Sequence, residues 1–513
     1  MIGTRADSSL AQSSAFGFKT ALQFMRKNAV GALLLSVLVL IPCFWHTHIQ
    51  AGDLGSHIYN AWLAQLAERH EISGIVVVRQ WDNVLFDLMV LHIANRFGLV
   101  AAEKLAVSIA VLIFFWGVFA FLTSVSDRAP WSLTPFLAVL SYGYAFHMGF
   151  MNYFLSIGLA FFALAVIWRS GAGNWLTGAI LAAFAFLAHP IGFTLIVSVA
   201  VYVSFWRISP YRTRLALPLT AVTSFIVLHR YFMVHQERVP SWRTEGIWQL
   251  LGQDQMNVYG HRYQLLSSLA LAWGAVCGAA AVYDWIFRVR KPSAALRIAI
   301  EIYTLAVIAT VCLPENFRTG IYAGWVGLLV SRLTLVTAVF GLLVLASVRL
   351  PPWSWRGAAV IAGIFFVLLY RDTGRLDRME TNARSLTQSL ARGTRIVAVA
   401  NAPEDWRVPF IYHSIDRACI GHCFSFANYE ASSLQFRVRA LSGNTVVTTL
   451  VDQSDDMSSG DYRVRKADLP LTSIYQCDDA DFTKLCALPL REGQKTEDPE
   501  SEPTPLTEED SEE

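Results

Sequence analysis

The stretch Gln50–Glu68, QAGDLGSHIYNAWLAQLAE, follows the first strongly apolar run, and the rest of the chain is organised around it. Asp53 and His57 are four residues apart, so a helix places both side chains on one face. The apolar residues also recur at helical spacing: Ile58, Trp62, Leu63 and Leu66. An acid at the end of a membrane span, with an imidazole one turn later, predicts a reactive site. The alternative is a surface helix with Asp53 as its cap.

The composition predicts a membrane protein. Of the 513 residues, 54% are hydrophobic and only 16% are charged, whereas globular domains carry about 25% charged residues. Apolar runs of about 17–25 residues recur along the chain, as in an α-helical polytopic membrane protein. The net charge of +2 and the scattered basic residues give no indication of a nucleic-acid partner.

Residues 28–370 are predicted to hold about eleven transmembrane helices. The predicted spans are Asn28–Trp45, Ala101–Ser124, Leu133–Gly149, Tyr153–Trp168, Trp175–His189, Ile191–Trp206, Leu215–Phe232, Tyr263–Phe287, Ile298–Leu313, Ile321–Val348 and Gly357–Tyr370. Their alternation places the basic loops on the side of residues 1–27, which carry four basic residues. By the positive-inside rule we expect a cytoplasmic N-terminus. Residues 46–100, the first outside loop, and all residues after Tyr370 are then extracytoplasmic.

Residues 371–490 are long enough for one small soluble domain. Arg395–Ala400 and Asn444–Leu450 have strand composition, and a helix is expected to continue from the last span to Leu390, so an α/β domain is predicted. Four cysteines lie in this extracytoplasmic region, and we expect the disulfides Cys419–Cys423 and Cys477–Cys486. The alternative is a metal site formed by Cys419, His422 and Cys423.

The tail, residues 491–513, is rich in Glu, Asp, Pro, Ser and Thr. It contains no aromatic residue and too little apolar surface to form a core. We therefore expect a disordered acidic tail.

Further polar residues are predicted near the outer membrane boundary, where they would contact a substrate. Ionisable side chains at membrane depth are costly and face protein or water. Arg332 lies inside a long apolar run and is either a structural partner or a functional cation. The other candidates are Asp82, Asp87, His147, Asn152 and Arg318. No nucleotide-binding G-x-x-x-x-G-K-[ST] motif, H-E-x-x-H zinc motif or G-x-S-x-G serine motif is present.

An N-terminal span, a first outside loop that opens with Asp53-Leu-Gly-Ser-His57, many further spans and an outside domain resemble the GT-C superfamily of membrane glycosyltransferases. Relatives in that superfamily include protein mannosyltransferases and lipid A aminoarabinose transferases. The resemblance covers the topology of the whole membrane part. It implies a multi-pass protein of the bacterial inner membrane, with a polyprenyl-phosphate sugar as donor and a cell-envelope glycan, lipid or protein as acceptor. The run Asp416–Glu430, DRACIGHCFSFANYE, is also distinctive, although no reaction follows from it.

The resemblance implies that Asp53 is the general base that removes a proton from the acceptor hydroxyl. Arg332 and Arg318 are candidates for stabilising the leaving phosphate. His57 would orient the acceptor or help Asp53 to hold a divalent cation. Two rival classes remain, a transporter or flippase of a lipid-linked sugar and a non-catalytic envelope scaffold.

Overall fold

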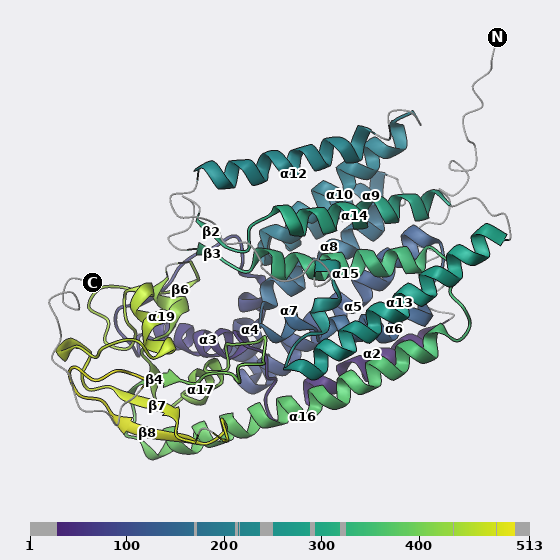
Figure 1. Ribbon diagram of the computed structural model, residues 1–513. Coiled ribbons are helices and arrows are strands. Elements are labelled where there is room, and N and C mark those ends of the chain that lie inside the picture. The colour runs from purple at the N-terminus through teal and green to yellow at the C-terminus, as the bar shows by residue number, and fades with distance from the viewer. Residues whose placement is uncertain are drawn as a thin grey trace, which may run out of the picture.

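A helical bundle makes up most of the molecule, and a smaller domain with a β-sheet lies at one end of it (Figure 1). The computed structural model describes residues 28–168, 172–210, 214, 216–235, 250–287, 293–318, 325–433, 435–478 and 480–497. The predicted cytoplasmic segment 1–27 and residues 498–513 of the predicted tail lie outside the described residues.

The bundle and its loops are mainly helical, because a helix satisfies its backbone polar groups within one segment. Its helices are α2 (Ala29–Phe44), α3 (Leu54–Glu68), α4 (Leu85–Phe97), α5 (Leu99–Ser126), η2 (Trp131–Leu133), α6 (Thr134–Ser141), α7 (Tyr144–His147), α8 (Met151–Ile167), α9 (Ala172–Ala188), α10 (Pro190–Ile208), α12 (Ala216–His235), η4 (Gln253–Met256), α13 (His261–Phe287), α14 (Ala294–Cys312), α15 (Leu329–Ala346) and α16 (Ser354–Ser389). Seven described helices are long and apolar enough to cross a membrane, namely α5, α10, α12, α13, α14, α15 and α16. The apolar helices α2, α8 and α9 are shorter, and the total of eleven spans remains a prediction.

The predicted span Leu133–Gly149 is not one helix. The chain breaks between α6 and α7, where Gly143 is extended and a Cβ on it would lie 2.7 Å from the carbonyl oxygen of Gln255. The Gln255 side chain accepts a hydrogen bond from the Ala145 amide at 3.1 Å. The polar segment η4 thus enters the bundle at the break. There Gln255 binds a backbone amide that would be paired within the helix if the helix were continuous.

The predicted span Ile321–Val348 begins later than expected. The described residues before α15 form a short hairpin, in which β2 (Phe317–Arg318) pairs with β3 (Trp325–Val326). Leu328 then adopts a left-handed conformation with φ 56°, and α15 starts at Leu329. Asn316 accepts a hydrogen bond from the Leu328 amide at 3.0 Å, which fixes this unusual turn directly before α15.

The C-terminal domain contains a four-stranded sheet in the order β5-β4-β7-β8. Its elements are β4 (Arg395–Val399), α17 (His413–Ala418), β5 (Phe424–Ser425), α18 (Tyr429–Ser432), β6 (Val438–Ala440), α19 (Val451–Ser459), η5 (Lys466–Asp468), β7 (Thr472–Gln476) and β8 (Leu485–Pro489). Strand β4 confirms the first predicted strand, but the predicted strand Asn444–Leu450 is wrong. The Asn444 side chain accepts hydrogen bonds from the Val446 and Val447 amides and so forms a turn in its place.

Three segments join the bundle to this domain. Helix α16 continues through the predicted boundary at residue 371 and runs along the bundle to the sheet (Figure 1). From the first outside loop, β1 (Ile75–Val77) pairs antiparallel with β6, and α3 is buried along most of its length. The ordered chain also extends past the predicted start of the tail, since the Val464 amide donates to the Gln494 carbonyl at 3.0 Å.

The two predicted disulfides are confirmed. Cys419 bonds Cys423, and Cys477 bonds Cys486. The alternative metal site at Cys419 and Cys423 is wrong, because both sulfurs are consumed by the disulfide and His422 Nε2 instead pairs with the Leu390 carbonyl oxygen at 2.8 Å.

Candidate functional site

Asp53 lies immediately before α3 and makes no side-chain capping hydrogen bond. Its amide donates to the carbonyl of Met148 at 3.1 Å, which fixes the start of α3 against the turn between α7 and α8. Close contact is possible because Gly52 has no side chain, and a Cβ there would lie 2.5 Å from the same carbonyl oxygen. The Asp53 side chain remains 16% exposed, so it is not fully enclosed by the protein.

Groups from three separate parts of the chain surround the Asp53 carboxylate. His413 Nε2 of α17 lies 3.6 Å from Asp53 Oδ1, and the Tyr429 hydroxyl of α18 donates a hydrogen bond to the carboxylate. Burial raises the pKa of Asp53, while the positive charges of His413, His57 and Arg332 lower it, and the net shift is upward. A carboxyl group with a raised pKa is a stronger proton acceptor than an ordinary surface aspartate.

His413 is held by a second carboxylate. Its Nδ1 donates to Asp416 Oδ2 at 2.7 Å, and Asp416 Oδ1 accepts a hydrogen bond from Ser425 Oγ at 2.6 Å. Burial lowers the pKa of the His413 imidazole, but the hydrogen bond and charge of Asp416 and the charge of Asp53 outweigh burial and raise it. The imidazole thus lies between two carboxylates, one on its own helix and one at the start of α3.

His57 contacts a second pair of carboxylates, and it lies beside Asp53. Its Nδ1 lies 2.8 Å from Asp87 Oδ1 and 3.6 Å from Glu430 Oε1. Burial lowers the pKa of His57, but the charges of Asp87 and Glu430 raise it to about 10, so this imidazole is cationic at neutral pH. Burial raises the pKa of Glu430 to about 7, against the opposing charge of His57.

Asn152 fixes the position of Asp87. Its side-chain amide donates to Asp87 Oδ2 at 2.8 Å, and its oxygen accepts a hydrogen bond from the Phe86 amide at the same distance. Asn152 therefore connects the first turn of α8 to α4 and orients a carboxylate toward His57.

Arg332 supplies a cation from the second turn of α15. Its Nη1 donates to the Gly327 carbonyl at 2.6 Å, and its guanidinium lies 4.1 Å from the centre of the Phe150 ring. Its Nε is buried and has no hydrogen-bond partner in the part of the chain that the structure describes. A buried donor left unpaired is costly, and an oxygen of a bound ligand would satisfy it.

The structure therefore brings five predicted residues together, namely Asp53, His57, Asp87, Asn152 and Arg332. His147 lies in α7 instead, where its Nδ1 is 3.0 Å from both the Gln50 carbonyl oxygen and the Tyr259 hydroxyl. Asp82 lies in the loop before α4, and its carbonyl accepts a hydrogen bond from Gln80. Arg318 lies in β2, and its side chain is outside the described part of the structure.

Sequence reasoning missed the residues that the C-terminal domain contributes, which are His413, Asp416, Tyr429 and Glu430. Three of them lie in the polar run 416–430, which stood out in the sequence without an assigned role. Its density of Asp, His, Asn and Glu beside a strand was the available signal. Among the described residues, no group of three or more His, Cys, Asp or Glu side chains is arranged to hold a metal ion.

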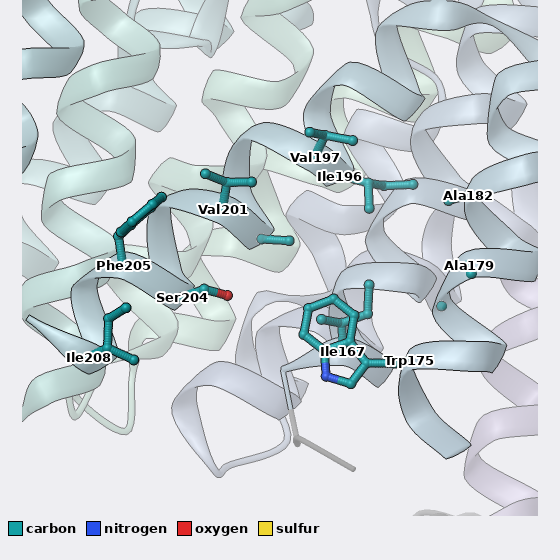
Figure 2. Close-up of a pocket in the computed structure, with 12 residues that line it drawn as sticks. Ile167, Trp175, Ala179, Ala182, Ile196, Val197, Val201, Ser204, Phe205 and Ile208 are labelled. Atoms are coloured by element: carbon teal, nitrogen blue, oxygen red, sulfur yellow. The ribbon is translucent and has the colours of Figure 1, made fainter. Parts of the chain in front are cut away.

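Of the cavities on the described part of the bundle, two are almost wholly apolar. One, of about 380 Å³, lies along α9 and α10 between Trp175 and Ile208 (Figure 2), at the end of this hairpin away from His189. The other, of about 370 Å³, lies between α10, α12, α14 and α15 and is lined by Leu329 and Leu333, which flank Arg332 on α15. We call the second cavity the α15 groove.

Comparison with protein-family models, curated proteins and solved structures finds no match for this chain.

Proposed function

We propose that the protein is a membrane glycosyltransferase of the GT-C type. It transfers a sugar from a polyprenyl-phosphate donor to a cell-envelope acceptor at the outer face of the bacterial inner membrane. The observation that carries the proposal is the pairing of two groups with opposite chemistry. Asp53 is a partly exposed acid with a raised pKa and makes no capping hydrogen bond. It lies within electrostatic range of Arg332, whose Nε has no hydrogen-bond partner among the described residues.

In this mechanism Asp53 accepts the proton of the acceptor hydroxyl as the acceptor oxygen attacks the anomeric carbon. The bond from that carbon to the phosphate oxygen breaks, and the phosphate gains negative charge. Arg332 stabilises this charge through its guanidinium, which binds phosphate oxygens well. Arg318 remains a second candidate for this task, and His57 with Asp87 would orient the acceptor.

The α15 groove supports a prenyl donor. It is almost wholly apolar, and Leu329 and Leu333 border it one turn apart, with Arg332 on the same stretch of α15. A chain of prenyl units in this groove would gain free energy by burying apolar surface, at about 25 cal/mol per Å². Its phosphate would then lie near the guanidinium.

The proposed orientation is N-terminus inside and C-terminal domain outside. Segments that carry basic residues and lie far apart in sequence contact each other in pairs, since Arg128 donates to the carbonyls of Ala346 and Val348 and Arg207 donates to that of Trp168. This arrangement is typical of a cytoplasmic end. A cysteine at Ser459 should react with a membrane-impermeant thiol reagent in intact spheroplasts. Labelling only after lysis would contradict the orientation.

The test of the activity is Asp53→Asn in envelope membranes supplied with polyprenyl-phosphate sugars. Asparagine keeps the size of the side chain but cannot accept a proton, so transfer should fall about 10²–10⁴-fold. The matched control is Asp127→Asn, the same change at an exposed residue that ends α5 in a left-handed conformation which asparagine also adopts. The control should transfer sugar at the wild-type rate.

Wild-type transfer by Asp53→Asn would refute the role of Asp53. A lipid-linked sugar that crosses the bilayer in proteoliposomes, but is never transferred to any acceptor, would favour the flippase alternative instead. Parallel assays with Mg²⁺ and with a chelator address the divalent cation, which the mechanism above does not require.

A further inference from the structure

His189 lies between α9 and α10, and its side chain caps the first turn of α10. Its Nδ1 accepts a hydrogen bond from the Ile191 amide at 3.2 Å. A ring nitrogen that accepts a hydrogen bond from an N–H group carries no proton itself, so this imidazole is neutral and its proton lies on Nε2. The described residues provide no hydrogen-bond acceptor for that Nε2–H group. His189 therefore has one donor left over after it has capped the helix.

Helix α8 fixes both the backbone and the ring of His189. Ser156 Oγ donates to the His189 carbonyl at 2.8 Å, and the Tyr153 ring lies nearly perpendicular to the imidazole, with the ring centres 5.7 Å apart. The two segments can approach this closely because Gly192 has no side chain, and a Cβ there would overlap Ser156 Oγ. The donor is thus held in place before a ligand arrives, which lowers the entropic cost of binding.

Tyr153 also connects His189 to Arg332. Its hydroxyl donates to the Arg332 carbonyl at 2.5 Å, and the imidazole lies within electrostatic range of the guanidinium. Arg332 has its own open donor, because no described residue accepts a hydrogen bond from its buried Nε. One neutral and one charged N–H donor are therefore available close to each other, at the beginning of α10 and in the second turn of α15.

Both donors lie beside the α15 groove, at the end where α10 and α15 begin. Ile191, whose amide binds the His189 ring, lines the groove on one side. Leu329 and Leu333, which flank Arg332, line it on the other side. The walls are almost wholly apolar, so an apolar chain with an anionic group at this end would match both features.

We propose that His189 binds the phosphate of the polyprenyl donor through its Nε2–H group, together with the guanidinium of Arg332. This role of His189 rests on the proposed transferase function and adds a second phosphate-binding residue to it. Phosphate oxygens accept several hydrogen bonds at once, and those from a cation are the stronger ones. Arg332 thus supplies the charge, and His189 fixes the orientation of the phosphate.

Two acidic groups lie within electrostatic range of the Arg332 guanidinium, and within the described structure neither forms an ion pair with it. One is Glu315, whose carboxylate oxygens accept hydrogen bonds from the amide and the hydroxyl of Ser331. The other is Asp53, the proposed base. A phosphate held by Arg332 and His189 would therefore lie within electrostatic range of the base, as the transfer reaction requires.

Two substitutions separate the donor from the helix cap. The side-chain oxygen of asparagine can take the place of Nδ1, so His189→Asn keeps the cap of α10 and loses the donor. The side-chain nitrogen of glutamine can reach the place of Nε2, so His189→Gln keeps a donor and loses the cap. The matched control is His92→Asn, the same change at an exposed histidine of α4.

The first experiment measures how tightly the purified protein in detergent binds a polyprenyl phosphate that carries no sugar. His189→Asn should bind it about 10–100-fold more weakly than the wild type, because one hydrogen bond to a charged group is lost. The unphosphorylated polyprenol should bind equally well to both. His189→Gln should bind the phosphate more tightly than His189→Asn but melt at a lower temperature, and His92→Asn should bind as the wild type does.

If His189 is a helix cap and nothing more, the order of the two variants is reversed. His189→Asn would then bind polyprenyl phosphate as the wild type does, and His189→Gln would be the weaker variant. That result would overturn the proposal, and so would an equal loss of binding in both variants.

The second experiment observes the wild-type protein directly. In ¹⁵N-histidine NMR, the signals of His189 are those missing from both variants, and they should show a protonated Nε2 and an unprotonated Nδ1. Polyprenyl phosphate should shift the Nε2 signal, whereas polyprenol should leave it in place. The same response to both ligands would refute a contact between His189 and the phosphate.

The outcomes distinguish this role from the transferase function itself. If the wild type binds polyprenyl phosphate through His189 but transfers no sugar, the transferase function fails and the phosphate site stands. If the wild type transfers sugar while His189→Asn keeps its full affinity for polyprenyl phosphate, the transferase function stands and the role of His189 is wrong.

Discussion

Two buried charged clusters join the C-terminal domain to the bundle, and they differ in how completely they are paired. The first surrounds Arg417, which we call the Arg417 network. The guanidinium binds Glu380 through two hydrogen bonds of 2.8 and 2.6 Å, contacts Glu103 at 3.3 Å and donates to the Ile49 carbonyl at 3.1 Å. The buried side-chain nitrogen and oxygen atoms of these charged residues all have partners in the described structure.

The second cluster is the candidate site, and it is incompletely paired. Within the described residues, the Nε of Arg332 and Oε1 of Glu430 are buried without a hydrogen bond, and His57 Nδ1 is close to Asp87 but poorly aligned with it. A saturated network stabilises the contact between two domains, whereas unsatisfied polar atoms in an accessible site are available to a ligand. The two clusters share α17, which carries both His413 and Arg417.

The largest effect is expected from Arg417→Met. Removing the guanidinium leaves Glu380 and Glu103 buried without a counter-charge, and breaking such a buried network costs about 3–5 kcal/mol. We expect a strongly reduced yield and melting temperature in detergent. The matched control is Arg69→Met, because Arg69 forms an exposed pair with Glu71. That change should alter stability by less than about 1 kcal/mol. Equal stability of the two variants would show that the Arg417 network is not structural.

Arg332→Ala should instead act on the reaction. Loss of one electrostatic contact to a transition state commonly costs about 3–4 kcal/mol, so transfer should fall by roughly 10²–10³-fold. Yield and melting temperature should change little, since only one described hydrogen bond, to the Gly327 carbonyl, is lost. The control is Arg356→Ala, an exposed arginine at the start of α16. A variant that misfolds but transfers sugar normally per folded molecule would show that Arg332 stabilises the fold, as the Arg417 network does, and takes no part in the reaction.

The predictable half of the candidate site follows from local periodicity. Asp53 and His57 share a helix face by their spacing alone, and Arg332 is conspicuous because an arginine in an apolar run needs a partner. The other half comes from His413 and Glu430 in the C-terminal domain. No local pattern places α17 against α3, since that contact depends on the packing of segments far apart in the chain.

The same limit explains the errors in the fold. Hydropathy identified apolar segments well, because burial in lipid or in the bundle needs apolar side chains whatever their neighbours. It could not reveal the break at Gly143, which depends on the approach of Gln255 from a distant loop. Nor could strand composition reveal that the Asn444 side chain accepts hydrogen bonds from the Val446 and Val447 amides, which form a turn there.

A smaller effect is expected when the link between the two clusters is loosened. The Cys419–Cys423 disulfide begins at the residue that follows α17, two residues after Arg417. For so short a loop, chain entropy predicts a loss of about 2 kcal/mol in Cys419→Ala/Cys423→Ala. Because both clusters use α17, transfer and melting temperature should fall together, which a thermal scan and a transfer assay on one preparation would measure. The control pair is Cys477→Ala/Cys486→Ala, which lies between β7 and β8 and should lower stability without changing the rate per folded molecule.

The smallest expected effect concerns the stability of Asp53→Asn, and it separates the two clusters most directly. The folded protein raises the pKa of Asp53 above its value in the unfolded chain, which is about 3.9. The stability linked to its proton is therefore present below that pH and is lost as the pH rises through the folded pKa. Asparagine does not titrate, so the variant should keep this stability at neutral pH.

We therefore expect the melting temperature of Asp53→Asn to equal or slightly exceed that of the wild type at neutral pH, with the difference shrinking toward pH 4. Melting curves between pH 4 and 8 would measure it, with Asp127→Asn as the matched control. A fall in melting temperature at neutral pH would mean that the Asp53 carboxylate stabilises the fold, as the Arg417 network does. Asp53 would then have a structural role. The contrast between the fully paired Arg417 network and the incompletely paired candidate site would no longer hold.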